Sequence, residues 1–221
     1  MKKLNWATAS DVSIILNRES GCRVGFCDWN FMSLSGTDVF FNGAVSHFDY
    51  VFCDGYWVHV YNRLKKRKSH YLTGPDMLQI VFENKEELLF LGLGECDLRE
   101  LRERLPGKRI ENLHIPFVDD VNDLDIEYIR STIIKSQITN VFVSIGCPKQ
   151  EKLMGLLGTV PKVNLFGTGA AVYFLTGKEK RAPRFVRAIK IEFIWRLLLN
   201  PKKQIKKWHN IFNFILGDVN R

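Results

Sequence analysis

A carboxylate with the character of a general base stands directly after an apolar stretch of the chain. Asp54 and Gly55 follow the run Tyr50–Cys53, whose composition is typical of a buried strand. Glycine permits a sharp turn here, and an aspartate that projects from a strand end can accept a proton from a substrate hydroxyl. The same pair also suits an ordinary turn or a helix cap. The residues alone leave both interpretations open.

A second candidate site is the turn Gly146-Cys147-Pro148-Lys149-Gln150-Glu151, which follows the apolar residues 141–145. Gly146 and Pro148 shape this turn, and the helix expected after it presents free N–H groups beside the Lys149 cation. Such a helix start binds anions and phosphates, and Gln150 can hydrogen-bond a base or a sugar. The alternative is a helix that simply begins at a proline, which explains Pro148 but not the whole string.

Two glycine-containing turns follow other apolar runs. Gly92-Leu93-Gly94 follows residues 88–91 and begins like a dinucleotide-binding GxGxxG motif, but Asp97 stands where the third glycine belongs. A plain strand-to-helix turn that lines the cleft explains it better. Gly167-Thr168-Gly169 follows residues 163–166. Its small residues either let a ligand approach the backbone or let a helix pack closely on the sheet.

The cysteines and histidines show no pattern typical of a metal site. Its five cysteines form no CxxC pair and its five histidines have no ligand spacing, which fits a reducing compartment. The string Asp119-Asp120-Val121-Asn122-Asp123-Leu124-Asp125 contains a DxD element of the kind that holds divalent cations. It stands just before an expected helix, where the dipole favours acids, and we interpret these acids as caps.

These turns require strands that end at one edge of a sheet, and the hydrophobic pattern supplies them. Apolar runs alternate with helical patterns, which indicates an α/β fold with right-handed crossovers and ligands bound beyond the carboxyl ends of the strands. We expect a Rossmann-like, mostly parallel sheet flanked by helices. The expected strands are 50–53, 88–91, 110–115, 141–145 and 163–166, and the expected helices are 76–83, 97–104, 125–136 and 149–157. Residues 34–44 lack a clear period and are expected to form a loop.

Length and composition indicate one globular domain with an appendage. The chain has 221 residues, of which 46% are hydrophobic and 25% charged, an ordinary globular composition with enough length for its own core. No apolar run approaches the roughly 18 residues of a membrane span, and the first residues show no signal-peptide core. We therefore expect a cytosolic chain with an α/β domain over residues 1–177 and a basic, helical appendage over residues 178–221.

The positive charge is concentrated in that appendage. Residues 178–207 carry eleven Lys and Arg against two Glu, so they contribute +9 to a net charge of +8. From Pro201 onward, Ile205, Trp208 and Phe212 share one side of a helix and lysines fill the opposite side. This pattern is typical of a segment that lies in a membrane interface, and it favours lipid over nucleic acid. A terminal helix docked on its own domain fits the periodicity equally well.

Four groups of residues, taken in order, resemble the WecG/TagA/CpsF glycosyltransferases, which form glycosyltransferase family 26. They are Asp54-Gly55 after a strand, Gly146-x-Pro148-Lys149-Gln150-Glu151, Arg181-Ala182-Pro183, and Glu192-x-x-x-Arg196-Leu197 with Pro201. The resemblance runs from about Thr8 to Lys207. It implies an inverting enzyme that moves a sugar from a UDP-sugar to a saccharide on a polyprenyl diphosphate lipid, at the cytoplasmic face of the membrane. It also implies that the enzyme requires no cofactor and no metal. The pathway implied is synthesis of a bacterial surface polysaccharide of the exopolysaccharide, capsule, teichoic acid or enterobacterial-antigen type.

The resemblance also implies roles for individual residues. Asp54 corresponds to the proposed catalytic base, and Thr8 and Gln150 correspond to further catalytic residues. The residues expected to hold the nucleotide sugar are Gly55, Gly92, Gly94, Gly146, Pro148, Lys149, Glu151, Gly167 and Gly169. Those expected to bind the acceptor diphosphate or an anionic membrane are Arg181, Arg184, Arg187, Arg196, Lys202, Lys203, Lys206, Lys207 and Trp208.

Two positions depart from the family pattern. Tyr71 stands where the family usually has an arginine, and Tyr173 stands where it usually has an aspartate. These departures leave open an altered donor, or a non-catalytic membrane-associated partner on the same scaffold. Apolar residues in the segment 185–199 are compatible with contact between copies of the chain as well as with a bilayer.

Overall fold

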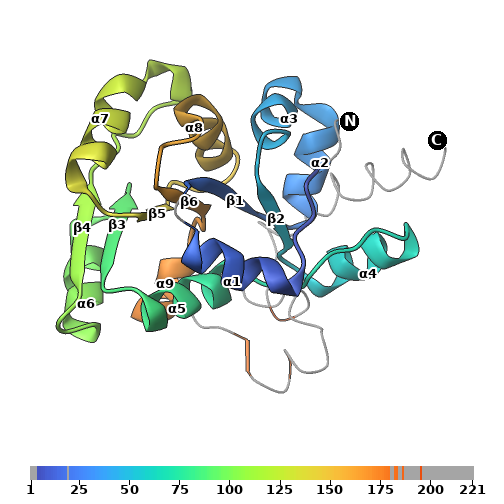
Figure 1. The fold of residues 1–221 in the computed structure, drawn as a ribbon, viewed down its shortest axis with the longest axis horizontal. Coiled ribbons are helices and arrows are strands. Elements are labelled where there is room, and N and C mark those ends of the chain that lie inside the picture. Colours follow the sequence, from blue (N-terminus) through green and yellow to red (C-terminus); the bar gives the residue numbers. More distant parts are fainter. Residues whose placement is uncertain (1–3, 19, 180–181, 184–185, 187–194, 196–221) are drawn as a thin grey trace.

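A six-stranded parallel sheet forms the centre of the protein, with strand order β2-β1-β6-β5-β3-β4 (Figure 1). The computed structural model describes residues 4–18, 20–179, 182, 183, 186 and 195. The strands are β1 (Cys22–Cys27), β2 (Tyr50–Cys53), β3 (Glu87–Leu91), β4 (Arg109–Leu113), β5 (Asn140–Val143) and β6 (Asn164–Gly167). The expected Rossmann-like α/β architecture is confirmed.

Helices cover both faces of this sheet. They are α1 (Ala9–Asn17), α2 (Trp29–Thr37), α3 (Val39–Val45), α4 (Tyr56–Leu64), α5 (Gly74–Asn84), α6 (Glu95–Arg104), α7 (Ile126–Ser136), α8 (Lys149–Leu157) and α9 (Ala171–Thr176), with a 3-10 turn at Val121–Asp123. α2, α3, α7 and α8 lie on one face, and α1, α5, α6 and α9 lie on the other (Figure 1). α4 instead projects sideways from the β2 end of the sheet.

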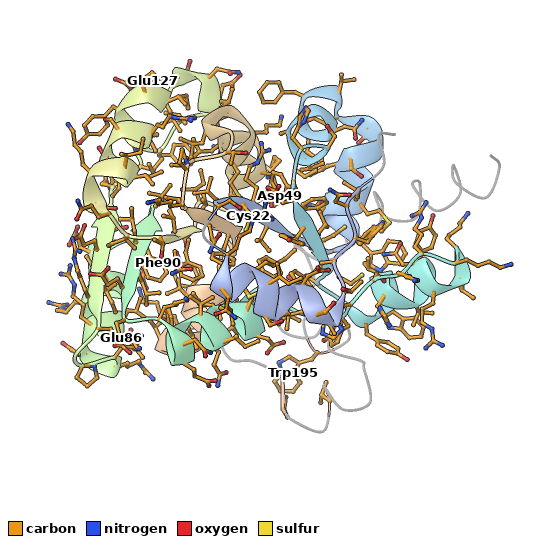
Figure 2. The ribbon with its side chains drawn as sticks, viewed as in Figure 1. Cys22, Asp49, Glu86, Phe90, Glu127 and Trp195 are labelled. Carbon is orange, nitrogen blue, oxygen red and sulfur yellow. The ribbon has the colours of Figure 1, made fainter. Side chains whose placement is uncertain are left out.

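Side chains of each strand alternate between two cores, one on each face of the sheet. In β2, Val51 belongs to the core beneath α2, α3 and α8, whereas Phe52 belongs to the opposite core. On that opposite face the register aligns three phenylalanines from adjacent strands. The ring of Phe142 stacks between Phe90, at 5.3 Å between centroids, and Phe166, at 5.1 Å. Figure 2 shows Phe90 inside the molecule. The row of rings holds the centre of the sheet together.

The expected strands are all present, with boundaries that differ by no more than two residues. The additional strand, β1, escapes a search for apolar runs because Arg23 and Gly25 interrupt it. It nevertheless lies between β2 and β6 and is paired on both sides. The four expected helices correspond to α5, α6, α7 and α8.

The expectation of a loop over residues 34–44 is wrong. Most of this segment belongs to α2 and α3. These helices are too short to show a clear period, but each has a cap. The carboxylates of Asp28 and Asp38 accept hydrogen bonds from the backbone N–H groups of Phe31 and Phe41, at 2.8 and 2.9 Å.

The acidic string at residues 119–125 caps helices, as expected. The Asp120 carboxylate accepts from the Asn122 N–H at 3.0 Å, and the Asp125 carboxylate accepts from the Tyr128 N–H at 2.9 Å. Among the residues that the structure describes, no three His, Cys, Asp or Glu side chains gather as a metal ion would require. In the same residues, no helix has the length and apolar character needed to cross a membrane.

The phenylalanine row gives a direct test of the core. Phe142→Ala removes a fully buried ring that contacts two others, so it should lower the free energy of unfolding by about 3–5 kcal/mol. Urea denaturation measures the change. Phe117→Ala is the matched control, because that ring is 90% exposed, and it should cost no more than about 1 kcal/mol. Equal losses in the two variants would contradict this account of the core.

Candidate active site

The candidate catalytic carboxylate lies where β1 and β2 end side by side. Asp54 follows β2, and its backbone N–H donates to the Cys27 carbonyl of β1 at 2.9 Å. Asp28 follows β1 directly. Burial first, and then the charges of Asp28 and Asp54 among others, raise the pKa of the Cys27 thiol. Both carboxylates therefore lie within electrostatic reach of one buried atom. Gly55, with φ 142°, turns the chain from β2 into α4.

A buried amide joins the start of α8 to the end of β6. Gln150 is 5% exposed. Its Nε2 donates to the Gly167 carbonyl at 2.9 Å and to Oε1 of Glu151 at 2.7 Å. A methyl group placed on Gly169 would lie 3.2 Å from Oε1 of Gln150 and 3.8 Å from the Gly146 Cα. The structure thus gathers these residues into one cluster, and glycine at 169 (φ 53°) lets the turn approach the amide.

Several buried oxygens at this edge have no hydrogen-bond partner within the described residues. All four follow β5 or β6: Ser144 Oγ, Gln150 Oε1, Glu151 Oε2 and Thr168 Oγ1. An unsatisfied buried polar atom costs on the order of 1–3 kcal/mol. Buried polar groups are therefore normally paired, and a polar ligand bound at this edge would provide such partners.

Glu151 is a buried carboxyl that holds its proton unusually well. Burial raises its pKa to about 7, against the effect of the hydrogen bond from Gln150, and the charge of Asp28 adds to the rise. The carboxyl therefore titrates near neutral pH. The neutral form can donate a hydrogen bond, which the ionised form cannot do.

Lys149 is held by the loop that follows β4. Its ammonium donates to the Val118 carbonyl and lies 4.4 Å from the centre of the Phe117 ring. An ammonium has three donors, so the bond to Val118 leaves two for an anion. Pro148 precedes it as the N-cap of α8.

Thr8 reaches the same edge from the N-terminal segment. The Ala7 carbonyl accepts from the His70 N–H at 2.8 Å, and the His70 carbonyl accepts from the Cys53 N–H at 3.0 Å. These bonds join three adjacent segments at Ala7, His70 and Cys53. The next residue on each segment is Thr8, Tyr71 and Asp54, respectively. The Thr8 hydroxyl donates to Asp11 Oδ2 at 2.8 Å, and its backbone N–H donates to the same oxygen at 2.6 Å. Thr8 is the N-cap residue of α1, and Asp11 at the third helical position forms a capping box with it.

Gly92 and Gly94 have contacts of another kind. A methyl group on Gly92 would lie 2.2 Å from Ile145 Cγ2, so this glycine allows the turns after β3 and β5 to touch. Gly94 is the N-cap residue of α6. These packing and capping contacts fit the plain strand-to-helix turn, and a ligand-binding role for the two glycines stays a prediction.

The two residues that depart from the family pattern make aromatic contacts. The Tyr71 ring meets Tyr56 at the start of α4 edge-on, with 6.4 Å between centroids. Tyr173 lies in α9 and packs against the core that contains the phenylalanine row, and the Lys178 ammonium lies 5.9 Å from its ring centre.

Asp28 is a residue of this edge that the sequence analysis missed, because β1 was not recognised. The available signal was the same as for Asp54: an aspartate directly after the short apolar run 24–27. The residues assigned to the acceptor diphosphate and the membrane, from Arg181 to Trp208, lie outside the described residues. Their roles and the division at residue 177 stay predictions.

Comparison with known proteins shows the family of the chain. Residues 2–219 match the Glycosyl transferase WecG/TagA/CpsF family. The chain belongs to this family. The match covers nearly the whole length of this WecG/TagA/CpsF family member.

Several relatives of this family member carry the name N-acetylglucosaminyldiphosphoundecaprenol N-acetyl-beta-D-mannosaminyltransferase. The protein of that name from Staphylococcus aureus strain MRSA252 is 27% identical over 169 residues, which are 72% of this chain and 65% of the relative. The one from Bacillus subtilis strain 168 is 26% identical over 141 residues, which are 63% of this chain and 55% of the relative. The alignments thus span less than two thirds of the relatives' own length.

The buried Glu151 predicts a particular pH dependence. A folded-state pKa of about 7 against an ordinary value of 4.5 means that the protonated carboxyl stabilises the fold below pH 4.5. This stability is lost as the pH rises through 7. Glu151→Gln should therefore gain stability relative to the wild type between about pH 5 and pH 8, by on the order of 3 kcal/mol. Urea denaturation at a series of pH values measures the difference. Parallel pH curves for the two proteins would contradict a buried ionisable carboxyl.

Proposed function

We propose that the protein transfers a sugar from a UDP-sugar to a saccharide carried on a polyprenyl diphosphate lipid, during synthesis of a bacterial surface polysaccharide. The observation that carries the proposal is that the Asp54 turn and the Gln150–Glu151 cluster share one edge of the sheet. Ligands of open α/β sheets bind at such an edge. The relatives are named for a diphosphoundecaprenol acceptor, which supports the lipid-linked acceptor.

In this proposal Asp54 is the general base. Its carboxylate takes the proton from the acceptor hydroxyl while the oxygen attacks the anomeric carbon. The new glycosidic C–O bond forms as the bond to UDP breaks, and UDP leaves with the electron pair. The attack comes from the face opposite the leaving group, so the anomeric configuration inverts.

The α8 turn is proposed to hold the donor. The N-terminus of α8 and the Lys149 ammonium offset the negative charge of the diphosphate. Oε1 of Gln150 accepts hydrogen bonds, and Oγ1 of Thr168 both donates and accepts them, which suits the hydroxyls of a sugar or a ribose. Glu151 is suited to an anionic ligand because its protonated form adds no negative charge. The diphosphate is stabilised by protein groups alone, without a metal ion.

The sugar and the place of reaction follow from the same reasoning. The relatives are named N-acetylmannosaminyltransferases, so we take an N-acetylhexosamine as the first donor to test, with a plain hexose as the alternative. A lipid-linked acceptor confines the reaction to a membrane surface. The protein is proposed to act there as a peripheral protein at the cytoplasmic face, held by its basic appendage.

Nucleotide selectivity tests the donor directly. Calorimetric titration with UDP, ADP and GDP, each with and without Mg²⁺, should show binding of UDP alone with an affinity that Mg²⁺ does not change. Equal affinities for the three nucleotides would contradict a UDP-sugar donor, and a requirement for Mg²⁺ would contradict the metal-independent mechanism. Absence of all binding would favour a non-catalytic membrane-associated partner, in line with Tyr71 and Tyr173.

The role of Asp54 is tested by removing only its basicity. Asp54→Asn keeps the size of the side chain, so UDP affinity should be unchanged while the rate of sugar transfer falls by about 10²–10⁴-fold. Glu103→Gln is the matched control, since this exposed carboxylate lies in the last turn of α6, at the opposite end of that helix from the turn after β3. Transfer at the wild-type rate by Asp54→Asn would overturn the assignment of the base.

A further inference from the structure

Helix α4 presents an apolar stripe to the solvent. Trp57, Val60 and Leu64 occupy positions i, i+3 and i+7, which share one side of a helix. The Trp57 side chain is 48% exposed and Leu64 is 78% exposed. The opposite side of the helix faces inward, since Val58 and Asn62 are fully buried. The inward side therefore packs α4 on the domain, and the apolar residues of the outward stripe are not needed for that packing.

A dense group of cations adjoins this stripe. Residues 63–68 read Arg-Leu-Lys-Lys-Arg-Lys, and the whole segment from Gly55 to Pro75 contains no Asp or Glu. In the part of the chain that the structure describes, no carboxylate forms an ion pair with Arg63, Lys66 or Lys68. We call the outward side of this segment the α4 surface, formed by Trp57, Val60, Arg63, Leu64, Lys65, Lys66 and Lys68.

The turn after α4 is fixed by its own hydrogen bonds. Buried Asn62 donates from Nδ2 to Cys53 Sγ at 3.4 Å, which ties the helix to β2. Arg67 donates from its backbone N–H to the Asn62 carbonyl at 2.8 Å and from Nη1 to Asn62 Oδ1 at 3.4 Å. Lys66 adopts the left-handed conformation, with φ 56°. Arg67 thus serves the turn, while Arg63, Lys65, Lys66 and Lys68 remain exposed around it.

We propose that the α4 surface binds the headgroups of an anionic lipid bilayer, with Trp57 and Leu64 entering the interface between the cations. This contact is separate from the appendage. The proposal extends the proposed function, because a lipid-linked acceptor requires the site to face a membrane. α4 begins at Tyr56, directly after Asp54-Gly55, so binding through this surface would bring the candidate base close to the bilayer.

The chemistry of the surface favours lipid over the other anionic or apolar partners. Exposed tryptophan beside Lys and Arg is typical of segments that lie in membrane interfaces. Each basic residue near an anionic surface contributes roughly a fivefold factor in binding at physiological salt. A second copy of the same chain would place like charges against each other, and the segment has no acids to pair with them.

The first experiment measures partitioning of the full chain onto vesicles. The charge variant Arg63→Gln/Lys66→Gln/Lys68→Gln and the wild type are sedimented with vesicles of phosphatidylcholine containing phosphatidylglycerol, and with phosphatidylcholine alone. The charge variant should bind the anionic vesicles at least about tenfold more weakly than the wild type. Arg99→Gln/Lys135→Gln/Lys162→Gln removes the same charge from exposed positions elsewhere and should bind nearly as the wild type does. Equal loss in both triple variants, or no loss in either, would overturn the proposal.

A second measurement locates the contact. On addition of anionic vesicles, backbone amides of residues 56–68 should exchange hydrogen more slowly in the wild type, and this protection should be lost in Trp57→Ser/Leu64→Ser. Protection that appears without vesicles and grows with protein concentration would overturn the proposal in favour of a second copy. UDP titration of the same variants separates the two ideas. Unchanged UDP binding with unchanged vesicle binding refutes the α4 surface alone, whereas absence of UDP binding in the wild type refutes the proposed function.

Discussion

The candidate site depends on a single buried amide. Nε2 of Gln150 uses both of its hydrogens inside the protein, one on the Gly167 carbonyl and one on Glu151. These two bonds fix the amide plane, and so they determine where its oxygen points. They also connect the start of α8 to the end of β6, which are 17 residues apart in the chain. A residue without two donors at this position would leave the Gly167 carbonyl and the Glu151 carboxyl without their shared partner.

Acidic groups of the candidate site are more buried than the cluster of cations near it. The carboxyl groups at this edge, Asp28, Asp54 and Glu151, are partly or fully buried, while the cations of residues 63–68 lie at the end of projecting α4 and in the turn after it. Three ionised carboxylates close together would repel a diphosphate. The raised pKa of Glu151 reduces that repulsion near neutral pH, since part of the population carries no charge there. The exposed cations attract anions over a longer range, until salt screens them beyond roughly 10 Å.

The sequence predicts what depends on hydrophobic runs and turns. It places the strands β2 to β6 and the turns that follow them, because fully buried parallel strands must be apolar and must end in polar residues. It fails at β1, because this strand contains the polar residue Arg23. The Asp49 carboxylate pairs with Arg23 and so allows it to lie in the sheet. It also fails at α2 and α3, where caps and tertiary packing replace periodicity. The cations of residues 63–68 escape notice for another reason. When net charge is summed over a long segment, acidic residues elsewhere in the segment cancel a short basic cluster such as this one.

Under the proposed function, the position of α4 determines how far the candidate base lies from a membrane. The helix begins one residue after Asp54-Gly55 has turned away from the sheet, and it ends at Leu64. Nine residues of helix span about 14 Å. A bilayer bound along the outward side of α4 would therefore lie within roughly that distance of Asp54. A diphosphate-linked saccharide is anchored at the lipid surface and extends outward by a distance of similar order. If α4 binds a membrane as proposed, a base at the start of this helix can reach the first sugars of such an acceptor, whereas a base in a distant cleft could not.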